Sequence, residues 1–397
     1  MALASCGGSG GSGSKGTQDP VATGGALATG GAPATGGTAP ATGGSTTGGV
    51  ATGGTSVATG GTAAGSAGVA GGGAAGASGA GAGGEVAGNG GSGGVGTGGT
   101  ATALAGPILR GGKAVLEFGD IYFEVDPAVG ARVTSVKVGA LELLSSKSVN
   151  ADNYGSTFWT SPQFGATGWN WPPVPEVDSA AYTLAAEQTS AVAVGPKVSA
   201  AAAEPVRDLS VSKKFSPDFA KRAVIIEYTL KNEGTVARQV APWEITRVGV
   251  GGLTFFAAES APVAATGEGA KPLTATTLSD GAYWFDYPAT QPETKLLANG
   301  KGWLAHVTAD GLLLIKTFDD LTAAELAPNE SEVELYTNAS SSPADGYVEV
   351  ENQGPYVMIP AGGSSSWSVT WYLRTLPATM MAAPGKPLVD LVTATIE

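Results

Sequence analysis

Aromatic and amide side chains are concentrated in one stretch of the sequence, residues 153–173. Trp159, Trp169 and Trp171 are three of the eight tryptophans, and Gln163 lies between them. An indole face can stack on the C–H groups of a sugar ring, while amide groups bond its hydroxyls. These residue types therefore favour a carbohydrate-binding site.

Glycines and prolines interrupt any regular period in residues 153–173, so this stretch is predicted to be a surface loop. The alternative to ligand binding is that its tryptophans close one end of a β-sandwich core. We expect Trp169 and Trp171 to be exposed. We expect Trp243 and Trp371 to be buried, because they have apolar neighbours in predicted strands.

Two carboxylates form a second candidate cluster. Glu349 and Glu351 are two residues apart in a predicted strand, so both should lie on one face of it. The chain has one histidine and one cysteine, which excludes an ordinary zinc site. We expect no metal and no cofactor, and we expect His306 to be a strand residue without a catalytic role.

Short alternating apolar segments divided by turn residues continue from residue 106 to the end of the chain. The predicted strands are 113–118, 121–125, 132–138, 141–144, 207–215, 224–230, 236–243, 253–257, 303–307, 312–318, 332–337, 347–351 and 366–373. Only 180–188 and 380–383 are helix candidates. This pattern predicts an all-β fold with two stacked antiparallel sheets in one domain, 106–397.

Residues 7–105 are low in complexity and contain no aromatic side chain. They repeat Ala-Thr-Gly-Gly at irregular spacing and hold most of the 63 glycines. Such a segment cannot bury enough apolar surface to offset its ordering entropy. It is predicted to be a disordered Gly/Ala/Thr-rich tether with an end-to-end distance of about 50–60 Å.

The single cysteine, Cys6, follows Leu3, Ala4 and Ser5. This segment resembles the lipobox of bacterial lipoproteins, whose cysteine receives the lipid. The resemblance implies that residues 1–6 are the remnant of a lipoprotein signal, and that a lipid holds the protein to a membrane. The expected location is the bacterial cell envelope, either the outer membrane or the periplasm. The alternative is a cytosolic protein with an incidental thiol.

The charge pattern bears on partners. The formal net charge is −13, and no basic stripe is visible, which argues against nucleic acid as a partner. No apolar run is long enough to span a membrane. We expect a monomer that reaches the membrane only through its N-terminal lipid.

Three segments together carry a family resemblance. Residues 121–144, 232–252 and 346–373, together with Trp-Thr-Ser-Pro-Gln at 159–163, resemble the galactose-mutarotase-like β-supersandwich. Within that fold they are most similar to a bacterial family of unassigned function. The resemblance implies one antiparallel β-supersandwich domain.

The resemblance also implies candidate catalytic residues. Sugar epimerases of this fold use a glutamate in a late strand, which Glu351 matches, with Glu349 in a competing register. Their histidine falls where this chain has Glu244, preceded by Pro242 and Trp243.

Three functions are therefore open. The first is carbohydrate binding, with Trp159, Trp169 and Trp171 stacking on the sugar. In that case Gln163, Arg247 and Glu349 or Glu351 would bond its hydroxyls. The second is a sugar epimerase or related carbohydrate-active enzyme, with Glu351 as base and Glu244 as acid. The third is a structural cell-envelope protein whose aromatic loop contacts another protein.

Overall fold

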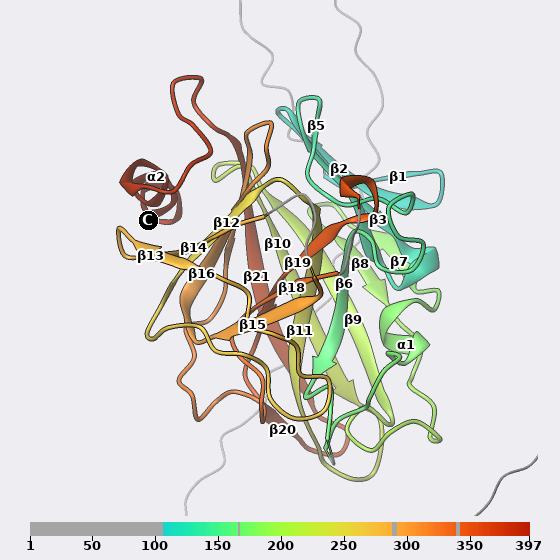
Figure 1. Ribbon diagram of the computed structural model, residues 1–397. Helices are drawn as coiled ribbons and strands as arrows, with labels where there is room; N and C mark the ends of the chain where they lie inside the picture. The colour runs from blue at the N-terminus through green and yellow to red at the C-terminus, as the bar shows by residue number, and fades with distance from the viewer. Residues whose placement is uncertain (1–105, 166, 288–291, 339–341) are drawn as a thin grey trace, which may run out of the picture. The chain divides into compact units, whose positions relative to one another are not determined.

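The computed structural model describes residues 106–165, 167–287, 292–338 and 342–397. Within these ranges nearly all regular structure is antiparallel β-strand, arranged in two sheets (Figure 1). The predicted all-β fold is confirmed. Cys6 and the predicted tether, 7–105, lie outside the described residues.

The first sheet carries the candidate site. Its strands run in the order β1 (Ile108–Arg110), β2 (Lys113–Phe118), β3 (Ile121–Asp126), β4 (Arg132–Val138), β6 (Ser156–Ser161), β11 (Arg238–Gly249), β19 (Tyr347–Gln353), β18 (Val333–Thr337) and β15 (Thr294–Ala298). β5 (Leu141–Glu142) pairs with β4, and β20 (Val357–Ile359) pairs with β11. The central strands come from distant parts of the sequence, so the site is assembled by long-range pairing.

The second sheet packs behind the first. Its order is β13 (Thr277–Ser279), β14 (Ala282–Asp286), β12 (Leu253–Ala258), β16 (Gly300–Val307), β17 (Leu312–Thr317), β21 (Ser364–Thr375), β10 (Ala223–Asn232), β9 (Leu209–Asp218), β8 (Ala191–Val194) and β7 (Thr183–Ala186). Two short 3₁₀ turns, Pro127–Val129 and Pro343–Asp345, lie in connections.

The main core lies between the two sheets. Phe158 of the first sheet stacks on Tyr228 of the second, with ring centroids 4.5 Å apart. Phe123 contacts both Phe215 and Trp371 from the second sheet. These aromatic contacts bury large apolar areas and hold the first sheet firmly from behind. Trp243 and Trp371 are buried, as expected.

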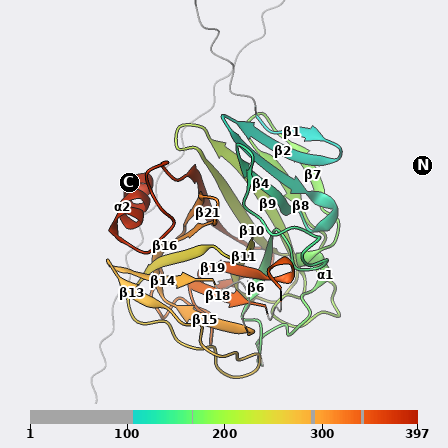
Figure 2. The ribbon, with the colours of Figure 1, turned by 45° about the horizontal axis from the view of Figure 1, so that its top comes forward.

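The outer face of the second sheet is covered by a helix that the sequence analysis missed. α2 (Lys386–Ile396) packs Leu388 and Val392 against a second apolar cluster that contains Phe255 and Trp284, beside β14 and β16 (Figures 1 and 2). Its β-branched residues give it a weak helix propensity, so tertiary packing determines its structure. The helix candidates were wrong, because 180–188 contains β7, 380–383 is irregular and the four-residue α1 (Pro175–Asp178) was not expected.

One part of the predicted aromatic loop is a strand. Residues Ser156–Ser161 form β6, in which every residue is buried. This segment, Ser-Thr-Phe-Trp-Thr-Ser, is rich in β-branched and aromatic residues that favour a pleated surface. Pro162 follows directly and ends the strand. The described residues of 162–173 are irregular, as predicted.

Candidate functional site

The register of the first sheet brings polar and aromatic side chains together on its outer face. Residues directly opposite one another on neighbouring strands point to the same face. One row is Arg247, Glu349, Tyr336 and Lys295; the next is Ile245, Glu351, Glu334 and Leu297; the third is Trp159, Trp243 and Gln353. Strands β6, β11, β19, β18 and β15 therefore build one continuous platform.

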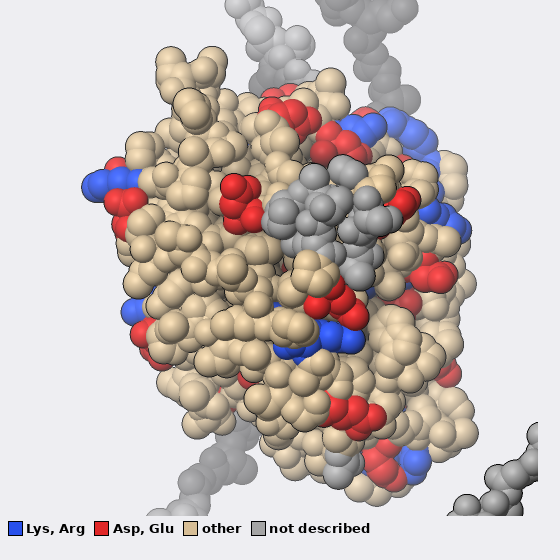
Figure 3. Space-filling view, viewed as in Figure 1, with Lys and Arg blue, Asp and Glu red and all other residues tan. Residues whose placement is uncertain are grey.

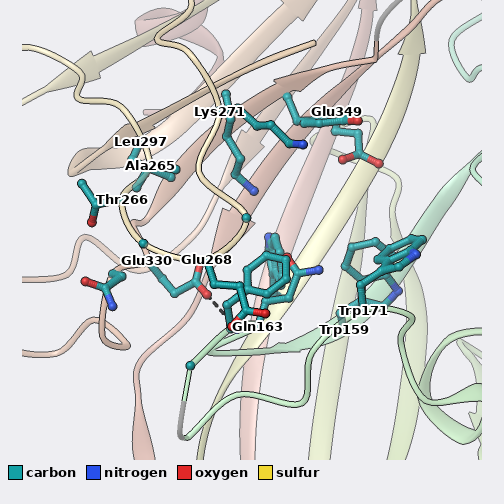
Figure 4. Close-up of a pocket in the computed structure, with 18 of the residues that line it drawn as sticks. Trp159, Gln163, Trp171, Ala265, Thr266, Glu268, Lys271, Leu297, Glu330 and Glu349 are labelled. Atoms are coloured by element: carbon teal, nitrogen blue, oxygen red, sulfur yellow. Dashed lines mark hydrogen bonds between the residues drawn. The ribbon is translucent and has the colours of Figure 1, made fainter. Parts of the chain in front are cut away.

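A cavity of about 540 Å³ lies above this platform. That volume falls within the range of about 300–1,000 Å³ found for small-molecule sites. Trp159 and Trp171 form one side of the cavity, while Lys271 and Glu349 extend into it from another (Figure 4). The lining residues are Asn153, Trp159, Gln163, Phe164, Gly165, Trp171, Trp243, Ala265, Thr266, Gly267, Glu268, Gly269, Lys271, Glu293, Lys295, Leu297, Pro328, Asn329, Glu330, Tyr336, Tyr347 and Glu349.

Trp159 is the centre of the aromatic wall. Its ring makes edge contacts with Trp169, Trp171 and Trp243, with centroids 5.8, 5.7 and 5.4 Å away. Its Nε1 donates a hydrogen bond of 2.8 Å to Asp178 at the end of α1. These contacts fix the orientation of the Trp159 ring from several sides.

The three predicted ligand-binding tryptophans differ in exposure. Trp171 is 54% exposed and lines the cavity. Trp159 is buried except for the part that reaches the cavity. Trp169 is 7% exposed, is absent from the lining, and donates from its Nε1 to the carbonyl of Thr160 at 2.6 Å. The expectation that Trp169 is exposed was therefore wrong, because its ring packs behind Trp159.

A loop, residues 265–271, covers the cavity from the opposite side. Gly269 has φ +77°, and a Cβ there would lie 2.2 Å from the ring of Phe164, so glycine is required at this contact. Lys271 pairs with Glu293 at 3.1 Å. The loop thus packs closely on Phe164, and its Lys271 forms an ion pair with Glu293, which directly precedes β15.

Arg247 lies directly behind the cavity wall. Its Nε donates to Glu349 at 2.7 Å, and its guanidinium lies 5.4 Å from the centre of the Trp159 ring. Its two terminal nitrogens are buried and have no hydrogen-bond partner among the described residues. Arg247 is fully buried and does not line the cavity, so it orients Glu349 and Trp159 from behind.

Lys295 links the platform carboxylates. Its Nζ lies 2.6 Å from Glu334 and 3.4 Å from Glu351. Burial alone would lower the pKa of Lys295, but Glu334, Glu351 and Glu330 together raise it above its ordinary value. Burial raises the pKa of Glu351 well above its usual range, and the Glu334 and Glu349 carboxylates add to this effect.

Glu330 is a cavity carboxyl that the sequence analysis did not single out. Its Oε1 accepts the backbone N–H of Gln163 at 2.8 Å, and Nε2 of Gln353 donates to its Oε2 at 3.3 Å. Burial and the nearby Glu334 carboxylate raise the pKa of Glu330 to about 8. The environment thus favours the neutral form of the Glu330 carboxyl, whose two oxygens are already hydrogen-bonded to Gln163 and Gln353.

Of the three predicted catalytic carboxylates, Glu349 and Glu351 lie on one face of the sheet and Glu244 lies on the other. Glu349 lines the cavity, and Glu351 lies on the same face but is fully buried beneath Lys295. Glu244 neighbours Trp243 in the strand and therefore points to the opposite face, into the core. Glu244 and Glu351 are thus not brought together as the acid–base pair that the resemblance implied.

Glu244 belongs to a buried network between the sheets. It pairs with Lys316 at 2.8 Å and accepts hydrogen bonds from Trp371 Nε1 at 2.9 Å and Tyr228 OH at 2.5 Å. His306 lies elsewhere in the second sheet, where burial lowers its pKa to about 3. Its Nδ1 lies 3.0 Å from Thr254 Oγ1, and neither His306 nor Glu244 lines the cavity.

The described residues also bear on metals and membranes. Among them, no group of three or more His, Cys, Asp or Glu side chains is arranged to hold a metal ion. No helix in the described ranges is both long and apolar enough to cross a membrane. The face seen in Figure 3 is largely uncharged, with basic and acidic side chains interspersed.

Comparison with known proteins identifies the family. Residues 154–374, more than half of the chain, match the family described as Domain of unknown function (DUF4380). The chain belongs to this family. No curated protein matches the sequence.

Several solved structures resemble the domain. The Slr1438 protein from Synechocystis sp. PCC 6803 is 15% identical, with a TM-score of 0.50 over 68% of this chain and 97% of that chain. A putative aldose 1-epimerase from Escherichia coli K12 is 12% identical, with a TM-score of 0.47 over 66% and 99%. A galactose mutarotase-like protein from Lactobacillus casei ATCC 334 is 11% identical, with a TM-score of 0.46 over 66% and 100%.

At these identities the likeness concerns the fold alone. The expected galactose-mutarotase-like fold in a family of unassigned function is confirmed. The activities in the names of these proteins belong to them, and the site of this chain has to be interpreted from its own residues.

Proposed function

We propose that the domain binds a carbohydrate in the 540 Å³ cavity above the first sheet. The observation that carries this proposal is Trp171, an indole 54% exposed at the cavity edge, facing polar groups on the opposite side. A sugar needs such an arrangement, because its C–H face stacks on an aromatic ring while its hydroxyls need donors and acceptors.

The polar groups around the cavity suit hydroxyls. Glu349 is held by Arg247 as an acceptor, Glu330 is a donor when protonated, and Tyr336 and Gln163 add polar atoms at the wall. Carboxyl groups outnumber lysines in the lining, four (Glu268, Glu293, Glu330 and Glu349) to two (Lys271 and Lys295), so the cavity offers no excess of positive charge to an anionic ligand. A neutral sugar fits this balance better than a strongly charged ligand.

A glycan array probed with residues 106–397 tests the proposal. We expect at least one glycan to bind, and we expect Trp171→Ala to weaken it roughly tenfold, the effect of losing about 1.4 kcal/mol. Leu278→Ala is the matched control, because Leu278 is 60% exposed but lies outside the cavity. Equal binding by wild type and Trp171→Ala would contradict the proposal.

An aldose ring-opening enzyme is the second candidate. Two carboxyl groups, Glu330 and Glu349, line one cavity in different environments, which is the pattern of an acid and a base. The base would take the proton of the anomeric hydroxyl while the acid gives a proton to the ring oxygen. A mutarotation assay on galactose and glucose tests this, and both Glu330→Gln and Glu349→Gln should abolish any activity found.

We also propose that the protein is an envelope lipoprotein anchored through Cys6. The support is the segment Leu3-Ala4-Ser5-Cys6 and the glycine-rich sequence after it. Metabolic labelling with a fatty-acid analogue in the native organism should mark the wild-type protein and not Cys6→Ser. If the wild-type protein is not labelled, the proposal of a lipid anchor at Cys6 is wrong.

A further inference from the structure

A second cavity, of about 420 Å³, adjoins the first. It lies near the end of β15 and beside the segment that leads into β18. Its lining residues are Ser260, Ala261, Val263, Leu297, Ala298, Asn299, Ala323, Leu326, Ala327, Pro328, Asn329, Glu330, Ser331 and Tyr356. The carbohydrate site described above uses only part of this surface.

The two cavities share a wall. Leu297, Pro328, Asn329 and Glu330 line both of them. Leu297 and Glu330 lie at the end of the first cavity that is remote from Trp159 and Trp171 (Figure 4). A ligand that stacks on the tryptophans and extends past Glu330 would therefore enter the second cavity.

The chemistry of the second cavity suits another sugar unit. Alanines at 261, 298, 323 and 327 contribute only small side chains to its lining, and Ser260, Ser331 and Tyr356 contribute hydroxyl-bearing side chains. Asn299 donates to Glu259 at 2.9 Å, while its own Oδ1 is buried without a hydrogen-bond partner among the described residues. The lining of the second cavity therefore combines small apolar side chains with hydroxyl and amide groups.

The charge of this lining also narrows the ligand class. It contains no lysine or arginine, and its one carboxyl group is that of Glu330. A phosphate or sulfate would find no cation here. Hydroxyl groups would find both donors and acceptors.

We propose that the second cavity is a subsite for the next unit of a glycan chain whose first unit occupies the tryptophan-lined cavity. This inference rests on the proposed function and deepens it. The ligand class is then a linear oligosaccharide or polysaccharide, and Glu330 contacts both neighbouring units. A free monosaccharide would use only half of the combined site.

The test compares glycan length with a blocked second cavity. The probes are the linear glycan that gives the strongest array signal and its fragments of one to four units, titrated against the full chain by calorimetry. The wild type should bind the two-unit fragment at least tenfold more tightly than the single unit. Ala323→Trp, which fills the second cavity from an exposed position, should remove that gain and leave single-unit binding unchanged.

Two further variants make the result decisive. Ala324→Trp is the matched control, because Ala324 is exposed and next to Ala323 but outside the lining. Ala261→Trp blocks the same cavity from another segment, so both blocking variants should give the same result if both keep the wild-type melting temperature. If both blocking variants still bind the two-unit fragment more tightly than the single unit, the proposed subsite is wrong, but the proposed function is not contradicted. Absence of all glycan binding by the wild type overturns both.

Discussion

At the scale of single residues, neighbouring tryptophans have opposite roles. Trp169 and Trp171 are two positions apart in an irregular segment, yet one is buried and the other is exposed. The sequence does not distinguish them, because an irregular segment has no period from which a buried side could be inferred. Only the packing of Trp169 behind Trp159 separates the structural residue from the candidate ligand residue.

Truncating these two tryptophans should therefore have different effects. Trp169→Ala should lower the free energy of unfolding by about 3–5 kcal/mol, because a buried ring and its hydrogen bond to Thr160 are lost. Trp171→Ala should change it by less than about 1 kcal/mol. Urea denaturation of both variants measures the difference. A Trp169→Ala variant as stable as wild type would show that Trp169 is not a structural residue of the aromatic wall.

Glu330 should make stability depend on pH. Its pKa is about 8 in the folded protein, above the ordinary carboxyl value, because burial and Glu334 oppose its charge despite the nearby Lys295. Because the pKa of Glu330 is higher in the folded state than in the unfolded state, the unfolded state loses this proton at a lower pH. Stability therefore falls between the ordinary carboxyl pKa and about pH 8, and is constant above it.

The variant Glu330→Gln isolates this effect. Glutamine is neutral at every pH and keeps an acceptor for the backbone N–H of Gln163. Relative to wild type, it should gain about 2–3 kcal/mol in unfolding free energy between pH 6 and pH 9, because wild-type stability falls by about 1.4 kcal/mol per pH unit up to the folded pKa of about 8. Glu268→Gln, a change at an exposed cavity residue, is the control and should show no such gain. Parallel pH profiles for wild type and Glu330→Gln would contradict the assignment.

At the scale of elements, α1 acts as a brace for the site. Although it has only four residues, its Asp178 accepts hydrogen bonds from Trp159 Nε1 at 2.8 Å and Thr157 Oγ1 at 2.9 Å. It also pairs with the buried Arg132 at 3.3 Å. One carboxylate therefore ties the short helix to β4 and β6 and fixes the central tryptophan.

Removing this carboxylate should loosen the aromatic wall. Asp178→Ala leaves Arg132 buried without its charged partner, so we expect a loss of about 3 kcal/mol in stability. Asp178→Asn keeps an acceptor for Trp159 and should lose less. Near-ultraviolet circular dichroism, which reports tryptophan packing, should change in Asp178→Ala more than in Asp178→Asn. Equal and small spectral changes in both variants would argue against the role of Asp178 in fixing Trp159.

Most strands could be predicted from the sequence, but the arrangement of side chains on the platform of β6, β11, β19, β18 and β15 could not. Alternation in segments such as Leu209–Asp218 and Ala223–Asn232 is visible in the sequence, since a two-residue period reports burial directly. The site depends instead on register between distant strands, which places Arg247 opposite Glu349 and Tyr336 opposite Lys295. No local pattern encodes that register, so Lys295 and Glu330 were missed.

β6 shows the same limit from another side. Its glycine- and proline-rich neighbours indicated a loop, but pairing with β11 makes it a central strand.

The carboxylates also show what the sequence could and could not predict. Alternation correctly placed Glu349 and Glu351 on one face, and it also implies that Glu244 lies on the face opposite Trp243. What alternation could not tell is which face of the sheet carries the cavity.

At the scale of the whole molecule, the described domain contains its own core. Among the described residues, the apolar clusters between the sheets and beneath α2 begin at Ala114. Residues 1–105 contain no aromatic side chain and are mostly glycine, alanine and threonine. The free energy of folding should therefore come almost wholly from residues 106–397, because buried apolar area is its main favourable contribution.

A chain that begins at residue 106 should consequently melt at the same temperature as the full chain, within about two degrees. For a domain of this size, one kcal/mol shifts the melting temperature by roughly one to two degrees. Limited proteolysis of the full chain should reach the same boundary, with β1 and the strands after it protected. The matched control is removal of α2 by ending the chain at residue 384. Because α2 covers Phe255 and Trp284, this deletion should lower the melting temperature strongly. A large drop for the chain that begins at 106 would instead mean that the glycine-rich segment contributes packed contacts.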